Sequence, residues 1–249
     1  MIDFKSDFHL HTKYSPDADP QATFQGYLER AKEIGIERLA FTDHLDIDPA
    51  NPLFSKRIDY DRYFPELERV IGASDIGIER GIELGYQRHV AAETNAFLAA
   101  HRFDFVILSV HYLEKKDLHS GEYYEGKTKE EAYRRYFEAC LDAVYTIGRF
   151  DVFGHLDHIA RYGDYGDYDY LEYRDAIDAV LIALIERGRG IEINTSGYRH
   201  LGRPYPKKEV IERFLELGGK RITIGSDAHR TKDLGRDFDR AKNELRDLL

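Results

Sequence analysis

Short apolar runs recur along the whole chain, and each of them ends in a side chain that can bind a metal ion. The runs are mostly apolar rather than alternating, which is typical of parallel strands buried on both faces. They predict strands over residues 3–9, 38–41, 77–83, 105–109, 151–154, 190–194 and 221–225. Their polar ends fall at His9, His44, Glu83, His111, His155, Asn194 and Asp227. Intervals from 28 residues (Glu83 to His111) to 44 residues (His111 to His155) hold one strand, one helix and two loops, which predicts a βα repeat.

Amphipathic patterns between these runs predict the helices of that repeat. Residues 22–34 carry apolar side chains at helical spacing, and Gly35 follows as a C-terminal stop. Similar patterns cover residues 133–147, 171–187 and 210–217, each followed by a glycine, and a last helix over 236–249 would complete the wall. Strand and helix thus alternate seven times. This predicts an α/β fold, a seven-stranded variant of the (β/α) TIM-like barrel, with the polar strand ends together at its C-terminal rim.

Length and composition narrow the picture further. A chain of 249 residues without a Pro/Gly/Ser-rich linker predicts one domain over residues 1–249. The net charge of −10 argues against a nucleic-acid partner, so an anionic substrate should be small and held by local cations. The one cysteine, Cys140, falls at a core position of a predicted helix, which leaves no disulfide and no thiolate zinc site. We also expect no signal peptide, no membrane partner and a cytoplasmic location. The oligomeric state stays open.

The chemistry begins in the first strand, at residues 7–11. Residues two apart in a strand face the same side, so His9 and His11 can present two imidazoles to one ion while Asp7 supports them from behind. Such a pair alone would equally suit a half-buried strand. Asp227 and His229 lie at the end of the last predicted strand, and a barrel closes its last strand against its first. The two motifs are therefore predicted to be neighbours.

Other polar residues at strand ends extend the candidate site. Glu83 stands between apolar residues and glycines, where a carboxylate is costly unless it is paired or bound to a metal. His111 and His155 have the same strand-end context. The remaining interpretations are that Asp43 and Asp157 orient imidazoles, that Asn194 and Glu192 shape the pocket, that His158 contacts substrate or solvent, and that His89, His101 and His119 lie on the surface.

With these motifs, the chain from Asp7 to His229 resembles the polymerase-and-histidinol-phosphatase (PHP) superfamily, and most closely its histidinol-phosphate phosphatase branch. The resemblance implies a distorted (β/α)7 barrel that holds up to three metal ions. It implies one ion held by His9, His11, Glu83 and Asp227, a second held by Glu83, His111 and His155, and a third held by Asp17, His44 and His229. Many relatives have histidine where this chain has Asp17, which makes the third site more anionic.

Two to three divalent ions in such a site predict a hydrolase. Mixed imidazole and carboxylate ligands suit Zn, Mn or Fe without choosing between them. Two ions a few ångström apart lower the pKa of a shared water and neutralise phosphoryl oxygens, so a metal-bridging hydroxide can attack phosphorus. Relatives of the phosphatase branch use arginines for phosphate in the loops that here carry Arg161 and Arg199, and His158 is a further candidate. Two arginines and the metals would grip a terminal phosphomonoester and crowd a diester.

The sequence therefore predicts a metal-dependent phosphomonoesterase that releases phosphate from L-histidinol phosphate in histidine biosynthesis. Asp17, Asp227 or His229 would manage the proton for the departing alkoxide, with Arg161 and Arg199 stabilising charge. Segments 112–126 and 162–170 would form a lid with aromatic and acidic contacts for an imidazole and an ammonium, or be ordinary polar loops. The alternatives are a phosphoesterase of the same superfamily acting on small nucleotides or other alcohol and sugar phosphates, and a non-catalytic metal-binding interaction domain.

Overall fold

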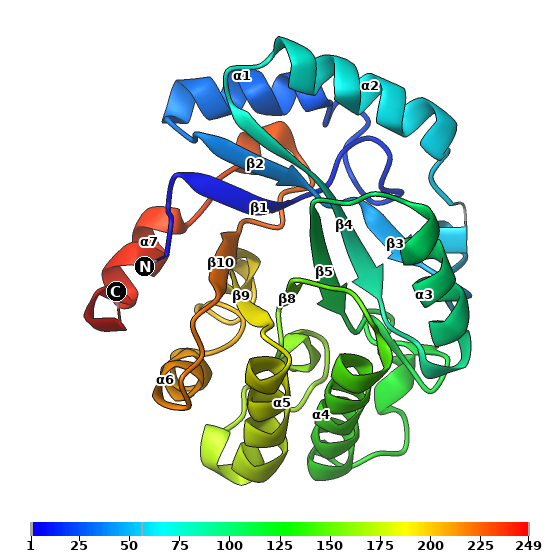
Figure 1. The fold of residues 1–249 in the computed structure, drawn as a ribbon. Helices are drawn as coiled ribbons and strands as arrows, with labels where there is room; N and C mark the ends of the chain where they lie inside the picture. The colour runs from blue at the N-terminus through cyan, green and yellow to red at the C-terminus, as the bar shows by residue number, and fades with distance from the viewer. Residues whose placement is uncertain (1, 56, 249) are drawn as a thin grey trace.

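A sheet of parallel strands forms the centre of the computed structural model, which describes residues 2–55 and 57–248 (Figure 1). In this part of the chain the sheet has eight strands, in the order β1, β2, β4, β5, β8, β9, β10, with β3 also paired to β4. Their bounds are β1 (Ser6–Leu10), β2 (Arg38–Phe41), β3 (His44–Asp46), β4 (Gly77–Gly85), β5 (Phe105–Ser109), β8 (Val152–Phe153), β9 (Gly190–Asn194) and β10 (Ile222–Gly225). All seven predicted strands are present. A separate hairpin pairs β6 (Tyr112–Leu113) with β7 (Lys116–Asp117).

The first and last strands of this sheet come together and nearly close a barrel. Leu10 and Ala228 form a parallel bridge, and the backbone N–H of His11 donates to the Ala228 carbonyl at 2.9 Å. Asp7, which was predicted to support the histidines from behind, contacts the backbone of His9 and not an imidazole: its carboxylate accepts from the backbone N–H of His9 at 3.3 Å and from those of Ser226 and Gly235, both at 2.9 Å. The buried carboxylate thus pairs backbone donors on both sides of the seam. The predicted distorted (β/α)7 barrel is confirmed.

Helices surround this sheet on its outer side (Figure 1). They are α1 (Phe24–Ile34), α2 (Tyr60–Ala73), α3 (Ala91–Ala100), α4 (Lys129–Thr146), α5 (Arg174–Glu186), α6 (Lys208–Glu216) and α7 (Phe238–Glu244). The predicted helices correspond to α1, α4, α5, α6 and a shorter α7, which is followed by a 3-10 turn at Arg246–Leu248. Residue 249, the predicted end of the last helix, lies outside the described residues. Helix α1 has both expected end signals, since the Thr23 hydroxyl accepts from the backbone N–H of Gly26 and Gly35 ends the helix in a left-handed conformation.

The second strand of the barrel is interrupted just before it reaches the rim. Strand β2 pairs with residues 77–80 of β4, and after Thr42 and Asp43 the chain resumes as β3 along residues 83–85. At the break, the Thr42 hydroxyl accepts from the backbone N–H of Leu10 at 3.0 Å, and Asp43 accepts from that of Thr12 at 2.7 Å. The interruption therefore ties β1 to β2 by side chains and delivers His44 and Asp46 to the rim.

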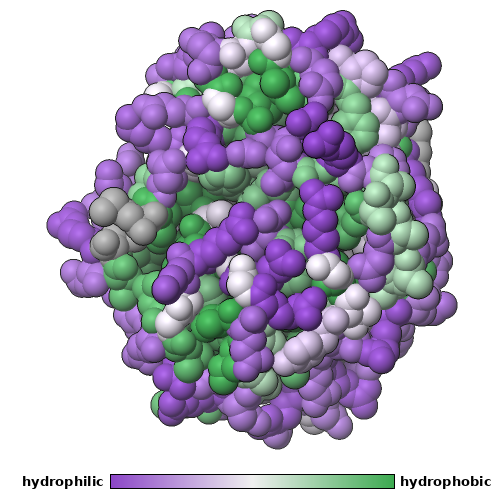
Figure 2. All heavy atoms as spheres, viewed as in Figure 1, coloured by the Kyte–Doolittle hydropathy of each residue, from purple (hydrophilic) through white to green (hydrophobic). Residues whose placement is uncertain are grey.

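Polar residues cover most of the face seen in Figure 2, with apolar side chains visible between them. Large aromatic residues fill the interior, among them Tyr27, Tyr63, Phe137 and Phe214. Cys140 is fully buried in α4, which confirms its predicted place in the core. Among the described helices, none has the length and apolar character that crossing a bilayer requires.

Candidate metal centre

Glu83, near the end of β4, is the centre of the candidate site. Its Oε2 lies 3.3 Å from His9 Nε2 and 3.5 Å from His11 Nε2. Its Oε1 faces the other way, 3.2 Å from His111 Nε2 and 2.9 Å from His155 Nε2. The side chain is fully buried, which alone would raise the pKa of Glu83, but the surrounding histidines hold that pKa well below its ordinary value. One carboxylate thus faces two groups of imidazoles, the geometry expected of a bridging ligand.

The two ends of the barrel seam meet beside Glu83. Asp227 Oδ1 lies 3.4 Å from His11 Nε2 and 3.8 Å from His9 Nε2, as expected if the last strand closes against the first. The backbone of Asp227 is left-handed, with φ of 54°. A non-glycine residue in this region stores strain of the order of 1–3 kcal/mol, and such residues cluster at functional sites. In this backbone conformation the Asp227 carboxylate faces His9 and His11.

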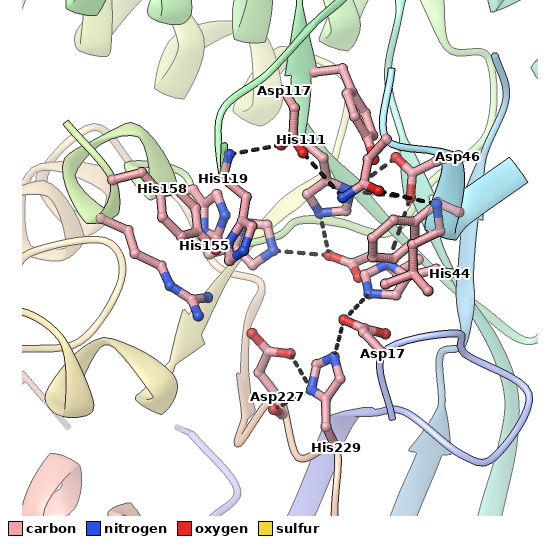
Figure 3. A pocket seen from close by; sticks show the side chains of 17 residues that line it. Asp17, His44, Asp46, His111, Asp117, His119, His155, His158, Asp227 and His229 are labelled. Carbon is pink, nitrogen blue, oxygen red and sulfur yellow. Dashed lines mark hydrogen bonds and ion pairs between the residues drawn. The ribbon is translucent and has the colours of Figure 1, made fainter. Parts of the chain in front are cut away.

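Asp17, His44 and His229 form the outermost part of the cluster, where the cavity opens to solvent. Asp17 Oδ2 lies 2.9 Å from His229 Nε2 and 3.7 Å from His44 Nε2 (Figure 3). The His11 ring stacks against both imidazoles of this part, with its centre 4.2 Å from that of His44 and 4.1 Å from that of His229. The structure thus brings together all nine predicted ligands, and the metal-binding role of each stays a prediction.

Two buried carboxylates orient imidazoles of the cluster, and the sequence reasoning did not assign either of them this role. Glu192 Oε1 lies 2.6 Å from His9 Nδ1, and Asp46 Oδ1 lies 3.0 Å from His111 Nδ1. Each therefore leaves the Nε2 atom of its histidine pointing at Glu83. Neighbouring glycines make room for them: a Cβ at Gly85 would lie 1.7 Å from Asp46 Oδ1, and one at Gly225 would lie 2.4 Å from Glu192 Oε1. In the sequence, glycines at strand ends next to polar strand residues were the signal that could have identified these two carboxylates.

The other residues that were predicted to support the cluster differ in how they contact it. Asp43 reaches an imidazole indirectly, since it accepts from the Ser15 hydroxyl at 2.7 Å and that oxygen lies 3.2 Å from His11 Nδ1. Asn194 is fully buried, and its Nδ2 donates to Glu192 at 3.2 Å and to Asp227 at 3.4 Å, so it holds two carboxylates from behind and does not itself line the cavity.

The prediction for Asp157 was wrong. Its carboxylate pairs with Arg203 at 2.9 Å and accepts from the Tyr168 hydroxyl at 2.9 Å, rather than orienting a histidine.

A cavity of about 270 Å³ lies above the cluster (Figure 3). Besides the cluster residues, it is lined by Asp46, Asn51, Leu53, Phe54, Tyr112, Asp117, His119, His158, Arg161 and Tyr162. Both predicted lid segments contribute to it, and they contact each other, because the Tyr165 hydroxyl donates to the Tyr124 carbonyl at 3.4 Å. The floor of the cavity thus consists of potential metal ligands, and its wall consists of aromatic and polar side chains.

The predicted substrate contacts lie at different depths. Arg161 and His158 both line the cavity from the 3-10 helix η4 (His158–Arg161), and His158 is buried rather than solvated. Arg199 is exposed, donates to the Ser226 carbonyl at 3.4 Å, and is absent from the cavity lining in the described part of the chain. His119 is exposed, as predicted for a surface residue, but it directly follows the β6–β7 hairpin and lines the cavity.

The two other histidines read as surface residues also differ from each other. His89 is exposed and pairs with Asp48 at 2.7 Å, as predicted. His101 is half-buried and stacks on Phe97 with ring centres 4.1 Å apart, so its prediction as a surface residue was wrong.

The protonation pattern of the cluster suits cations. Burial alone would lower the pKa values of His9, His44 and His111, but facing carboxylates raise all three, that of His111 to about 10. Burial and the neighbouring His229 and His44 instead lower the pKa of His11 to about 3. Without metal, protons on some imidazoles therefore balance the buried carboxylates. Divalent ions can replace these protons.

Unpartnered atoms locate the positions that ions would fill. In the described residues, His9 Nε2, His11 Nε2 and Glu83 Oε2 are buried and make no hydrogen bond. Buried polar atoms are almost always paired in folded proteins, and these three lie within 4.8 Å of one another. Three further groups have the same spacing: His9, His155 and Asp227; His44, Glu83 and His111; and His11, His44 and His229. The residues thus fit a cluster of divalent metal ions with overlapping ligand sets.

Comparisons with known proteins agree with this geometry. A family model described as the PHP domain matches residues 7–196. The chain is 35% identical over 233 residues to a histidinol-phosphatase from Lactococcus lactis subsp. lactis, covering 92% of this chain and 85% of that protein. It is 32% identical over 250 residues to a probable histidinol-phosphatase from Clostridium acetobutylicum, covering 96% and 91%. A crystal structure of the histidinol phosphate phosphatase from Lactococcus lactis, complexed with zinc, L-histidinol and phosphate, matches with a TM-score of 0.88 at 32% identity, covering 99% and 94% of the two chains.

Proposed function

The chain belongs to the PHP domain family and is a phosphatase, and we propose that it releases phosphate from L-histidinol phosphate in histidine biosynthesis. The observation that carries this proposal is the cavity floor, where Glu83 faces imidazoles with both of its oxygens. A relative that covers nearly the whole chain binds zinc, L-histidinol and phosphate, which supports the same chemistry here. A cytoplasmic location and a single domain over residues 1–249 fit this role and stay predictions.

Nine residues would hold the metal ions. We propose one ion at His9, His11, Glu83 and Asp227, a second at Glu83, His111 and His155, and a third at Asp17, His44 and His229. The zinc of the Lactococcus relative supports zinc as one of them. Bound divalent ions would lower the pKa of water and offset the charge of phosphoryl oxygens.

The side chains around this floor would position the ester and manage its protons. Arg161 presents the only guanidinium on the cavity lining in the described residues, and its fork suits non-bridging phosphate oxygens. His158 lies beside it, and burial together with the neighbouring His155 holds the pKa of His158 well below its ordinary value, so this imidazole is neutral. Asp17 pairs with His229 at 2.9 Å where the cavity opens, and when no ion occupies the third position this pair would suit transfer of a proton to the departing alkoxide.

One wall of the cavity would recognise the alcohol. Asp117 is buried on this wall, where one of its oxygens accepts from the backbone N–H of His119 at 2.7 Å and the other accepts from Asn51 Nδ2 at 3.3 Å. A carboxylate with spare acceptor positions beside Tyr112 and Tyr162 suits an ammonium or an imidazole. L-Histidinol carries both groups.

A phosphate-release panel tests the proposed function. On metal-replete protein, histidinol phosphate should give a kcat/KM at least about tenfold above that for nucleotide monophosphates, sugar phosphates and an aryl phosphate, the scale of one well-made contact. Equal or faster turnover of a nucleotide or a sugar phosphate would favour the broader phosphoesterase. No turnover of any ester would favour a metal-binding interaction domain, although every predicted ligand position holds a competent side chain.

Replacing Asp117 by asparagine should separate alcohol recognition from chemistry. The change keeps the shape but removes the charge that would face the substrate cation, so we expect KM for histidinol phosphate to rise about tenfold, since hydrogen bonds to charged groups contribute roughly 1.5–3 kcal/mol. The KM for an aryl phosphate should stay the same. Glu122→Gln, an exposed change in the same segment, is the matched control. An equal rise in KM for both esters would contradict this role of Asp117.

Metal binding should release protons, because an imidazole must be neutral to bind a metal. The pKa of His111, raised to about 10 in the metal-free protein, leaves that ring protonated at pH 7.5, so the apparent metal affinity should rise with pH up to that value. Calorimetric titration of the metal-free protein in buffers of different ionisation enthalpy counts the protons released. Asp46→Asn removes the carboxylate that helps hold the His111 proton, and it should reduce this count. Metal binding without proton release would contradict the argument.

A further inference from the structure

A buried cluster of charged residues lies next to the metal centre, between the loops that follow β8 and β9. Asp157 is its inner member, with only 1% of its surface exposed. One oxygen of this carboxylate receives three partners: the Arg203 guanidinium at 2.9 Å, the Tyr168 hydroxyl at 2.9 Å and the backbone N–H of Lys207 at 3.1 Å. None of these residues lines the cavity, so within the described chain the cluster is separate from the site itself.

Arg203 connects three segments through one guanidinium. Besides Asp157, it binds both carboxylate oxygens of Asp167, at 2.8 Å through Nε and 2.6 Å through Nη2. Asp167 belongs to the predicted lid segment 162–170, whereas Asp157 follows β8 and Arg203 itself follows β9. A planar fork with several donors can hold two carboxylates in fixed directions, which a lysine cannot do. The Lys207 ammonium also donates to the backbone of Tyr168, which fixes the same lid segment.

Asp157 stands directly before η4, the short helix that carries His158 and Arg161. The carbonyl of Asp157 accepts from the backbone N–H of Ala160 at 3.0 Å, so this residue forms the first turn of η4. The Asp157 side chain does not cap η4, and its three hydrogen-bond partners all lie outside that helix. The position of η4 therefore depends on what holds the Asp157 carboxylate. Removing one partner from a buried ion pair leaves an uncompensated charge, so loss of Arg203 should favour a shift of the turn that carries Asp157.

We propose that Arg203 is a positioning residue for phosphate binding, which acts by fixing Asp157 and, through it, the orientation of Arg161 and His158 toward the metal centre. The proposal rests on the proposed function, since it assumes that η4 faces the phosphate. A residue of this kind should affect substrate affinity through Arg161, beyond any effect on stability. Arg203 should therefore lose its influence once Arg161 has been removed.

A double-mutant cycle of Arg203→Met and Arg161→Ala tests this dependence. Arg203→Met should raise KM and the inhibition constant of inorganic phosphate about tenfold, with metal content unchanged. In the Arg161→Ala background the same change should raise them less than about twofold, because coupled residues are not additive. Arg203→Lys, which keeps the charge without the fork, should lie between wild type and Arg203→Met. Arg240→Met is the matched control, since Arg240 donates to Gly202 in the same loop from the exposed surface, and it should leave both constants unchanged.

Two results would overturn the proposal: Arg203→Met that lowers the melting temperature but keeps KM and phosphate inhibition, or effects of the two changes that add in full. If Arg203→Met does not fold, Arg203→Lys and Asp157→Asn enter the same cycle with the same expectation. The cycle uses any phosphate monoester that the wild type hydrolyses, such as an aryl phosphate. Failure to hydrolyse histidinol phosphate would therefore count against the proposed function alone, and additive effects would count against the positioning role alone.

Discussion

Replacing Glu83 by alanine should remove more than one equivalent of metal and lower kcat by roughly a thousandfold, which corresponds to about 4 kcal/mol of transition-state stabilisation. The reason is the position of this carboxylate, with Oε2 facing His9 and His11 and Oε1 facing His111 and His155. Loss of one shared ligand should weaken the binding of two ions at once. Elemental analysis and kinetics on the purified variant measure both effects. The melting temperature should fall as well, because bound metal stabilises the folded state.

Glu79→Ala is the matched control for this prediction. Glu79 lies on the same strand but at the other end, where its carboxylate pairs with Arg38 at 2.7 Å on the surface. That variant should keep its metal and its activity. Cys140→Ser should also leave activity nearly unchanged, since the thiol is buried in α4. Full metal content in the Glu83→Ala variant would exclude the bridging role.

Much of this candidate metal centre could be predicted from the sequence because parallel strands end at one rim. Apolar runs marked the strands, so polar residues at their ends had to converge whatever the details of the helices. His9 and Asp227 illustrate this. They are 218 residues apart in the chain, yet His9 Nε2 lies 3.8 Å from Asp227 Oδ1 at the seam. Strand closure alone predicts that contact.

The supporting residues were harder to predict, because their roles depend on side-chain directions that spacing does not contain. Asp46 belongs to β3, a three-residue continuation after the break at Thr42 and Asp43, and no apolar run marks so short a strand. Helix α3 was not predicted either, since five of its ten residues are alanine and it shows no one-sided apolar stripe. Asp157 looked like a partner of His155 from its position in the chain, but the chain turns there and presents the carboxylate to Arg203.

The two arginines predicted to bind phosphate should now give different results. Arg161 lines the cavity, whereas the exposed Arg199 donates to the Ser226 carbonyl. We expect Arg161→Ala to lower kcat/KM about a hundredfold, through a higher KM and, where the guanidinium meets charge that develops during transfer, a lower kcat. Arg199→Ala should change kcat/KM by less than about threefold, which makes it the matched comparison. Steady-state kinetics with phosphate as a competitive inhibitor measures both variants.

The Arg161 variants also distinguish a fork from a point charge. Arg161→Lys should recover only part of the lost kcat/KM, because an ammonium cannot make two parallel bonds to phosphate oxygens. Phosphate should inhibit Arg161→Ala more weakly than wild type, since product and substrate would use the same guanidinium. Equal losses for Arg161→Ala and Arg199→Ala would mean that the loop after β9 moves to the phosphate when substrate binds. If neither variant differs from wild type, the phosphate must be held elsewhere on the rim, and His158 and His119 would be the nearest cavity-lining candidates.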